Sequence, residues 1–124
     1  MTSIQPQLWI EHAGQAHTFY ERAFGAEVLH LVGEGDDIVA QLAVGDAAFW
    51  VARASAEMSR FSPTGIGGAT ARFLLVVDNP DATMSEAVAA GGVESSPVSD
   101  EHGWRLGRVR LSDVEEAEDV TGVR

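Results

Sequence analysis

Hydrophobic and polar residues alternate over 4–11, a pattern typical of a half-buried strand. One face of this segment is apolar and carries Leu8 and Ile10. The other face is polar and aromatic and carries Gln5, Gln7 and Trp9. If the apolar face packs on a helix, the polar-aromatic face lines a cleft. A dimer interface and an exposed face are the alternatives.

Residues 13–24 follow a helical period, because apolar side chains recur at i, i+3, i+4 and i+7. They are Ala16, Phe19, Tyr20 and Ala23. Gly25 is well suited to end this helix. Three extended segments follow, over 26–32, 38–44 and 47–54, with Gly35-Asp36-Asp37 and Gly45-Asp46 at the turns. The first half therefore predicts a βαβββ unit.

The second half repeats this order at an offset of 66 residues (91 minus 25, glycine to glycine). A strand over 69–77 leads to Asn79-Pro80, which starts a helix with Asn as cap and Pro at the first helical position. The expected buried stripe of that helix is Met84, Ala87 and Val88, and Gly91-Gly92 stops it. Strands over 93–98 and 103–111 follow, joined by a polar turn over 99–103.

The repeat breaks in the tail. The offset of 66 carries the strand 48–52 onto 114–118, which reads VEEAE and has poor strand propensity. Apolar residues recur there at about helical spacing, so a short helix and a frayed end are the alternatives. The predicted fold class is α+β, with two βαβββ modules of which the second lacks its usual last strand. The expected parts of this single domain are module one (about 1–54), a linker (55–68), module two (69–112) and an acidic tail (113–124).

A dimeric ferredoxin-like barrel is the competing fold, but three strands after the first helix favour the paired modules. A length of 124 residues fits one domain with a real core. No run approaches the roughly 20 apolar residues that a bilayer needs, and no secretory signal is present, so we expect a cytoplasmic protein without membrane contact. The absence of Cys excludes disulfides and thiolate chemistry.

The formal net charge is -11, and all basic residues are Arg. Such a field repels nucleic acid, whose binding needs Lys and Arg at the phosphates. It would attract cationic ligands into an acidic cleft, although solubility alone is the alternative role.

Several short motifs resemble one known superfamily. The most specific is FYERAFGAE at 19–27, and the others lie at 44–46, 62–63, 67–68, 76–82 and 89–92. Together they resemble the glyoxalase/bleomycin-resistance/dioxygenase (vicinal oxygen chelate) superfamily, in its glyoxalase-like or phosphonate-operon-B-like branch, from about residue 4 to Arg110. The resemblance implies two βαβββ modules around a cleft, and a homodimer. Enzymes of this superfamily hold a divalent metal with His, Gln and Glu from both modules.

Transfer of these ligand positions to the present sequence yields one candidate. Gln5 occupies the first-strand position, whereas the equivalent in module two falls near Ala71 or Arg72, which do not bind divalent metals. The segment 48–52 offers no carboxylate, and the family's closing Asp-Pro-x-Gly turn is absent after Arg110. We therefore expect no family metal centre and no cofactor, with a divalent metal at Gln5 as the alternative.

The other candidate residues form no recognisable catalytic motif. His12, His17, His30 and His102 are not paired at metal-binding spacing, and exposed or turn positions are their expected role. His102 alone sits where the family has a loop over the cleft mouth. No Ser-His-Asp relay is recognisable, and the Gly-rich stretch 65–68 precedes a strand, so a phosphate cradle is not expected.

The predicted cleft lining combines the polar-aromatic row with large apolar residues of other strands, for which core packing is the alternative. Its members are Gln5, Gln7, Trp9, Trp50, Phe73, Leu75, His102 and Trp104. The predicted function is that of a small-molecule-binding protein of the bleomycin-resistance type, with a cationic or aromatic ligand and no catalysis. The alternatives are a metal-dependent lyase, isomerase or dioxygenase of the superfamily, and a degenerate dimeric member that binds nothing.

Overall fold

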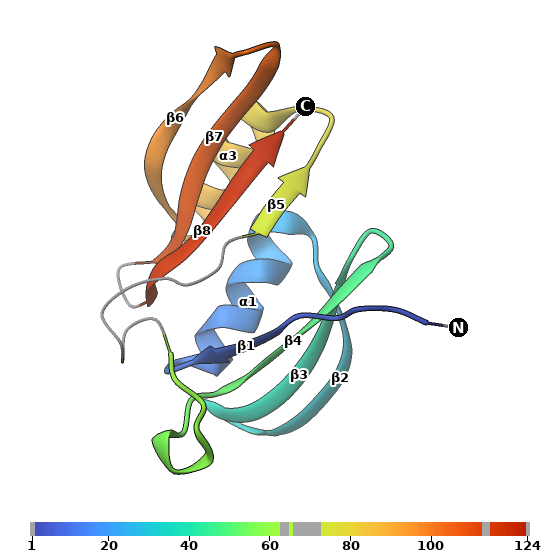
Figure 1. Ribbon diagram of the computed structural model, residues 1–124, viewed down its shortest axis with the longest axis vertical. Coiled ribbons are helices and arrows are strands. Elements are labelled where there is room, and N and C mark those ends of the chain that lie inside the picture. The colour runs from blue at the N-terminus through green and yellow to red at the C-terminus, as the bar shows by residue number, and fades with distance from the viewer. Residues whose placement is uncertain (1, 63–64, 66–72, 113–114, 124) are drawn as a thin grey trace.

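The computed structural model describes residues 2–62, 65, 73–112 and 115–123 and contains two modules of the same strand order (Figure 1). Module one contains β1 (Gln7–Ile10), α1 (Ala13–Phe24), β2 (Glu27–Glu34), β3 (Asp37–Val44) and β4 (Ala47–Arg53). Its sheet order is β1-β4-β3-β2, with β1 parallel to β4 and the other pairs antiparallel. A short 3-10 helix, η1 (Ala56–Met58), follows.

Module two contains β5 (Phe73–Val76), α3 (Pro80–Ala89), β6 (Val93–Glu101), β7 (Trp104–Ser112) and β8 (Glu115–Val123). Its sheet order, β5-β8-β7-β6, repeats that of module one. The α+β class and the paired βαβββ modules are thus confirmed.

The expectation of a missing last strand was wrong. Strand β8 lies inside the second sheet, parallel to β5 and antiparallel to β7, so its backbone is paired on both sides. Strand formation depends more on such pairing than on intrinsic preference, which explains how an acidic segment completes the sheet. Val114, which the helical alternative used, lies outside the described residues.

The structure also differs from the sequence-based expectations at the end of β6 and on α3. Strand β6 continues to Glu101, so the polar turn expected over 99–103 shrinks to the two residues between Glu101 and Trp104. Val88 is 45% exposed and is not part of the buried stripe of α3. Of the expected strand over 69–77, residues 69–72 lie outside the described residues, as do 63–64 and 66–68 of the linker.

Local sequence explains where α1 ends and where α3 begins. Gly25 adopts the left-handed conformation (φ 66°) at the end of α1, where its N–H donates to the carbonyl of Glu21 and the N–H of Ala26 donates to the carbonyl of Tyr20. Asn79 caps α3, because its side-chain oxygen accepts a hydrogen bond from the N–H of Ala82 at 3.1 Å.

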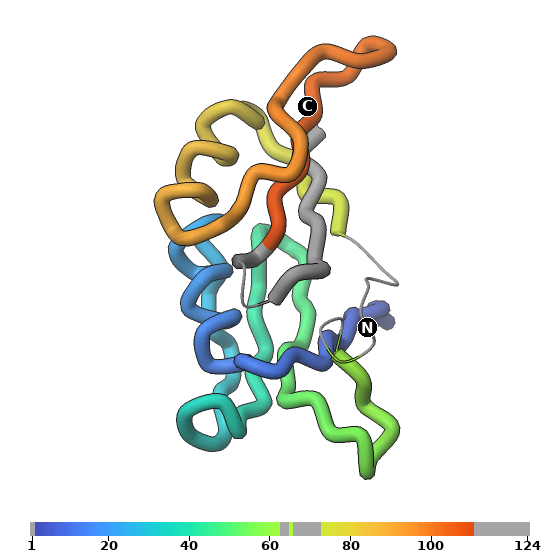
Figure 2. Tube along the Cα trace, turned by 90° about the vertical axis from the view of Figure 1, so that its left-hand side faces the viewer, coloured from blue at the N-terminus to red at the C-terminus, as the bar shows by residue number. Residues whose placement is uncertain are grey.

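The two modules share one hydrophobic core on the helix side of their sheets. Figure 2 shows α1 and α3 next to each other, and the two helices are in contact. Between the modules, Phe49 of β4 lies edge-on to Phe73 of β5, with ring centroids 5.5 Å apart. Tyr20 of α1 completes this aromatic row at 5.1 Å from Phe49. Among the described elements, α1 and α3 each cover one face of their sheet, and no helix packs on the other face, which we call the uncovered face.

Candidate ligand-binding site

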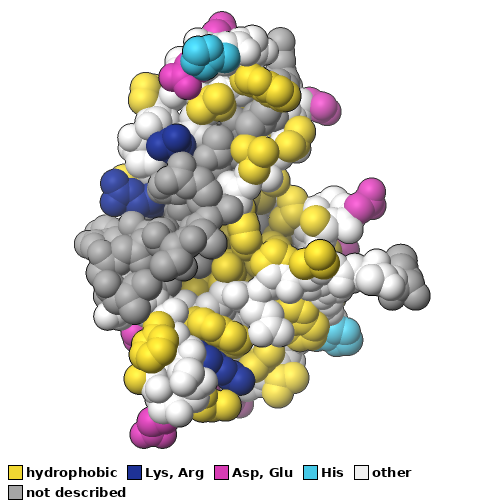
Figure 3. All heavy atoms as spheres, viewed as in Figure 1, with side chains coloured by type: hydrophobic (Ala, Val, Ile, Leu, Met, Phe, Trp, Pro, Cys, Tyr) yellow, Lys and Arg dark blue, Asp and Glu magenta, His cyan; other side chains and the backbone are white. Residues whose placement is uncertain are grey.

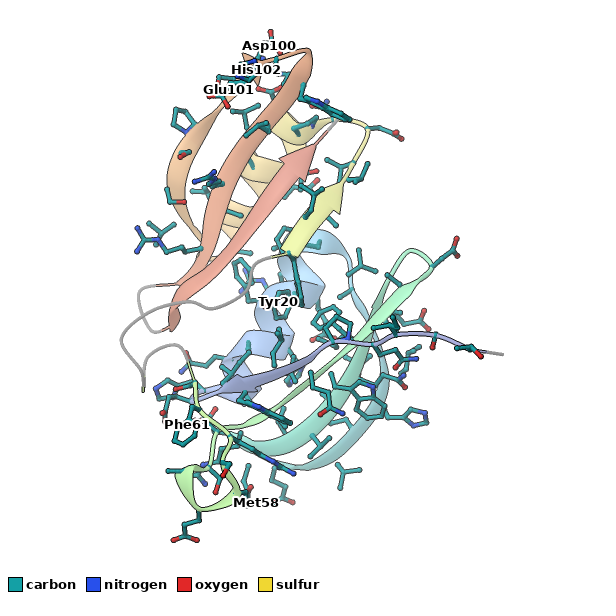
Figure 4. All side chains as sticks on the ribbon, viewed as in Figure 1. Tyr20, Met58, Phe61, Asp100, Glu101 and His102 are labelled. Atoms are coloured by element: carbon teal, nitrogen blue, oxygen red, sulfur yellow. The ribbon has the colours of Figure 1, made fainter. Side chains whose placement is uncertain are left out.

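A groove of about 770 Å³ lies where the two modules meet, and we call it the inter-module groove. Its walls come from the second half of α1, the β3–β4 turn, the consecutive residues 73–77 at β5, and α3. Figure 3 shows hydrophobic side chains gathered in the hollow between the modules, and Figure 4 shows Tyr20 in the middle of the molecule. The lining residues are Pro6, Tyr20, Ala23, Phe24, Val44–Phe49, Phe73–Val77, Thr83 and Glu86.

The floor of the groove is aromatic because strand alternation points Phe49 and Val51 toward α1 while Trp50 points away. Phe49 is 7% exposed and Tyr20 is 2% exposed, so they are supported by the core and offer one edge to the groove. Phe73 and Leu75 are partly buried against the same core. These rings are therefore held rigidly before any ligand arrives.

Two carboxylates stand at the rim of this apolar groove. Asp46 follows Gly45, whose positive φ of 57° makes the β3–β4 turn, and Glu86 lies on the exposed side of α3. Neither has an ion-pair partner within the described residues. A positive charge on a ligand would find both of them unneutralised beside the aromatic floor.

Two of the predicted cleft residues, Phe73 and Leu75, line the inter-module groove. Gln5, Gln7, Trp9 and Trp50 lie together on the opposite, uncovered face of the first sheet, as the alternation of β1 and β4 requires. There the side-chain oxygen of Gln5 accepts hydrogen bonds from Nε1 of Trp50 at 2.8 Å and from Nε2 of Gln41 at 2.9 Å. The Trp9 ring carries the guanidinium of Arg60, 4.9 Å from its centroid.

His102 lies at the far end of the β6–β7 hairpin, away from module one (Figure 4), and Trp104 is the first residue of β7 after this turn. His102 occupies the turn with a positive φ of 52°, and Trp104 is 54% exposed. Neither lines the inter-module groove. The structure therefore divides the eight predicted residues among three places.

The sequence does not predict the rest of the aromatic floor or the two carboxylates of the groove: Tyr20, Phe49, Asp46 and Glu86. The helical stripe predicts a core position for Tyr20, and both Tyr20 and Phe49 contribute to the core and to the groove. For Asp46 the sequence predicts only a turn position. No local signal joins Asp46 and Glu86, because they are 40 residues apart (86 minus 46) and belong to different modules.

The residues at the family's metal position do not fit a divalent metal centre. The only candidate oxygen, that of Gln5, already accepts two hydrogen bonds. Within the described part of the chain, no group of three or more His, Cys, Asp or Glu is positioned to hold a metal ion. Ala71 and Arg72, the positions compared in module two, lie outside the described residues.

Two histidines line a second, more polar cavity of about 590 Å³ beside the start of α1. Nδ1 of His12 lies 3.4 Å from an oxygen of Asp36, and Nδ1 of His17 lies 3.1 Å from an oxygen of Glu21. His30 is exposed on β2.

None of the described helices is long and apolar enough to cross a membrane.

No protein-family model matches the sequence, and no curated protein matches it. Solved structures share its fold over nearly the whole chain. A gene product of Arabidopsis thaliana is 24% identical with a TM-score of 0.75, covering 100% of this chain and 99% of that one. A glyoxalase/bleomycin resistance protein/dioxygenase family enzyme from Burkholderia phytofirmans PsJN is 17% identical with a TM-score of 0.72, covering 95% of each chain.

A bleomycin-binding protein solved in complex with bleomycin is 13% identical with a TM-score of 0.67, and the match covers 100% of this chain and 98% of that one. The chain therefore has the fold of the glyoxalase/bleomycin-resistance/dioxygenase superfamily. The resemblance inferred from the sequence motifs is confirmed at the level of the fold.

Proposed function

We propose that this protein binds a small molecule in the inter-module groove and that the preferred ligand carries an aromatic ring and a positive charge. The observation that carries the proposal is an open, mostly apolar groove of about 770 Å³ with two unpaired carboxylates at its rim. Its volume falls in the range of about 300–1,000 Å³ that ligand pockets occupy, and such pockets are apolar with few polar groups. This groove also argues against a member that binds nothing.

The chemistry of the lining supports binding without catalysis. The described lining of the groove contains no His, Ser, Cys or Lys, and its two carboxylates, Asp46 and Glu86, are exposed and belong to no recognisable nucleophile–base pair. A cation over an aromatic ring contributes roughly 0.5–2 kcal/mol. The net charge of -11 adds a long-range attraction for cations.

We propose that the protein binds its ligand without a metal. The side-chain oxygen of Gln5, the one candidate for a metal ligand, already accepts hydrogen bonds from Trp50 and Gln41. Elemental analysis of protein purified without chelator checks this point. Stoichiometric zinc, iron, nickel or manganese would favour the enzymatic alternative instead.

Titration calorimetry with bleomycin, as a cationic glycopeptide with planar rings, tests the ligand class. We expect saturable binding that weakens with salt, and Asp46→Asn and Glu86→Gln should each weaken it by about 2- to 5-fold, as for exposed charge pairs. Glu57→Gln is the matched control, because Glu57 is an exposed carboxylate on η1 outside the groove. Absence of binding below about millimolar concentration, or equal weakening by the control, would argue against this site.

We also propose that the protein is a homodimer. Large hydrophobic residues are exposed on the uncovered face of the second sheet: Leu74 is 61% exposed, Val76 is 70% exposed and Trp104 is 54% exposed. A second copy is the partner that the fold suggests for such faces. Sedimentation equilibrium should give twice the chain mass, and a monomer at all micromolar concentrations would contradict the proposal.

A further inference from the structure

We propose that the free edge of β2 is a docking site for an extended segment of another protein, one that is apolar in its middle and basic at both ends. This surface is separate from the inter-module groove, because no residue of β2 lines the groove. The inference therefore stands or falls independently of the small-molecule ligand.

Strand β2 is a long, apolar edge strand. It lies at the end of the sheet order β1-β4-β3-β2, so β3 is its only partner among the described strands. Its middle is unusually open for apolar residues: Leu29 is 43% exposed, Leu31 is 49% exposed and Val32 is 70% exposed. The outer side of such a strand presents unpaired N–H and C=O groups, which is a template for another strand.

Natural edge strands are usually protected by Lys, Pro, inward-pointing charges or bulges. Between Glu27 and Glu34, β2 contains no Lys, no Pro and no charged residue, and His30 is its only other polar side chain. The one protective device in this strand is a bulge between Val28 and His30, and residues 30–34 pair regularly with β3.

The bulge decides where the charges at the two ends of β2 point. Glu27 pairs with Ala43 and Glu34 pairs with Asp37, and these two β3 positions are an even number of residues apart. Without the extra residue at Leu29, Glu27 and Glu34 would lie on opposite faces. With it, both lie on the uncovered face of the sheet, on the same side as Val32.

An acidic group therefore closes each end of an apolar edge roughly 20 Å long. The end at Glu34 is reinforced by Asp37 directly opposite, and neither carboxylate has an ion-pair partner among the described residues. No Arg lies on β2 or β3. Charge complementarity thus favours a partner strand with Lys or Arg at both ends.

The same charges disfavour a second copy of this chain on the edge. If two β2 strands paired antiparallel with full overlap, Glu27 of each copy would lie opposite Glu34 of the other. Like charges directly opposite one another are destabilising in a sheet. The edge is therefore guarded against itself while remaining open to a basic partner.

Fluorescence polarisation with the full chain and a labelled peptide, Lys-Val-Thr-Val-Thr-Val-Lys, tests the proposal. We expect saturable binding that weakens with salt and is lost for the same peptide with Glu at both ends. Val32→Lys should weaken binding at least about tenfold, and Glu27→Gln with Glu34→Gln by about tenfold, the product of two exposed pairs. Val93→Lys is the matched control, because Val93 is 44% exposed on β6, an edge strand of the other sheet, and lies outside the inter-module groove.

Backbone pairing is tested separately with a peptide N-methylated along one edge, which should not bind. Amide chemical shifts of the unmodified protein should change at 27–34 on titration, a readout that needs no variant to fold. The proposal is overturned if Val32→Lys and Val93→Lys weaken binding equally, if the Glu-ended or N-methylated peptide binds as well, or if the shifts map elsewhere. Self-association that Val32→Lys abolishes would assign the edge to a second copy and would overturn it too.

Discussion

The two modules share a strand order but differ in how their helices are held against their sheets. Among the residues whose burial the structure describes (2–62, 65 and 73–110), fifteen Ala, Val, Ile, Leu, Phe and Tyr residues are buried, of which thirteen lie in module one and two, Ala87 and Val109, lie in module two. Helix α1 reaches its sheet through the large side chains of Phe19 and Tyr20. Helix α3 buries only Pro80 and Ala87 and approaches its sheet closely.

Glycine makes this close approach possible. A Cβ added at Gly107 of β7 would lie 2.8 Å from Cγ2 of Val98 and 3.1 Å from Cε of Met84 on α3. A polar clamp supplements the packing, since the guanidinium of Arg105 bonds both oxygens of Asp81 on α3, at 2.7 and 2.8 Å. The same topology is thus stabilised by side-chain volume in one module and by backbone proximity with an ion pair in the other.

Deletion of residues 113–124 should have the largest effect on stability, and it acts on module two. Strand β8 lies between β5 and β7, so its removal leaves β5 without any partner in the sheet. We expect a loss of more than about 5 kcal/mol, comparable with the whole stability of a small domain. Urea denaturation followed by far-UV circular dichroism measures it. Glu116→Gln with Glu118→Gln keeps the backbone and should unfold near the wild-type midpoint; a deletion variant that did the same would refute the role of β8.

Tyr20→Ala probes the side-chain-rich module. Tyr20 is 2% exposed and contacts the rings of Phe19, Phe24 and Phe49. Its truncation leaves a cavity in the shared core, and we expect the free energy of unfolding to fall by about 3–5 kcal/mol.

Leu31→Ala is the control for this change, because Leu31 is 49% exposed and its truncation should cost well under about 1 kcal/mol. Equal effects of the two substitutions in the same urea titration would mean that Tyr20 is not a core anchor.

Local patterns with two agreeing signals were predictable from the sequence. Helix α1 begins at Ala13 and ends at Phe24 as expected, because a complete apolar stripe is followed directly by Gly25. Asn79-Pro80 likewise placed the start of α3. Such signals depend only on residues within one or two turns, so no tertiary knowledge was needed.

Features set by pairing partners were not predictable. The polar residues at 99–101 read as a turn, yet they extend β6 because β7 pairs with them. The offset between equivalent residues of the two modules is 66 at the helix ends but 68 at the first residues of the last strands (115 minus 47). A constant offset of 66 therefore aligns β4 with residues of the tail that are not its structural equivalents. The groove was not predictable for the same reason, since Asp46 and Glu86 come to line one groove only when the two modules pack together.

Gly107→Ala tests the backbone proximity of module two. The added methyl group meets Val98 and Met84, and overpacking of this kind costs about 1–3 kcal/mol. Val98→Ala removes the closest of these atoms, so Gly107→Ala should cost less in a Val98→Ala background. Thermal unfolding of the four proteins in this cycle measures the coupling. Strict additivity would show that the added methyl group does not clash with Val98.

Arg105→Gln should have the smallest effect on stability, because it removes only the ion pairs of Arg105, one of which links β7 to α3. The hydrogen bonds to Asp81 and then Asp100 raise the pKa of Arg105 further above its already high ordinary range. A raised cationic pKa preserves stability at all lower pH, so the guanidinium stays charged from acid to mildly alkaline solution, and the clamp is lost only where its carboxylates take up protons. Because these groups are exposed, salt screens them and the melting temperature should fall only slightly. Arg108→Gln is the matched control on the same strand, on the opposite face of β7. The decrease for Arg105→Gln should vanish in molar salt while the control shows none; a decrease that persists in salt would mean that Arg105 acts through packing of its aliphatic stem and not through charge.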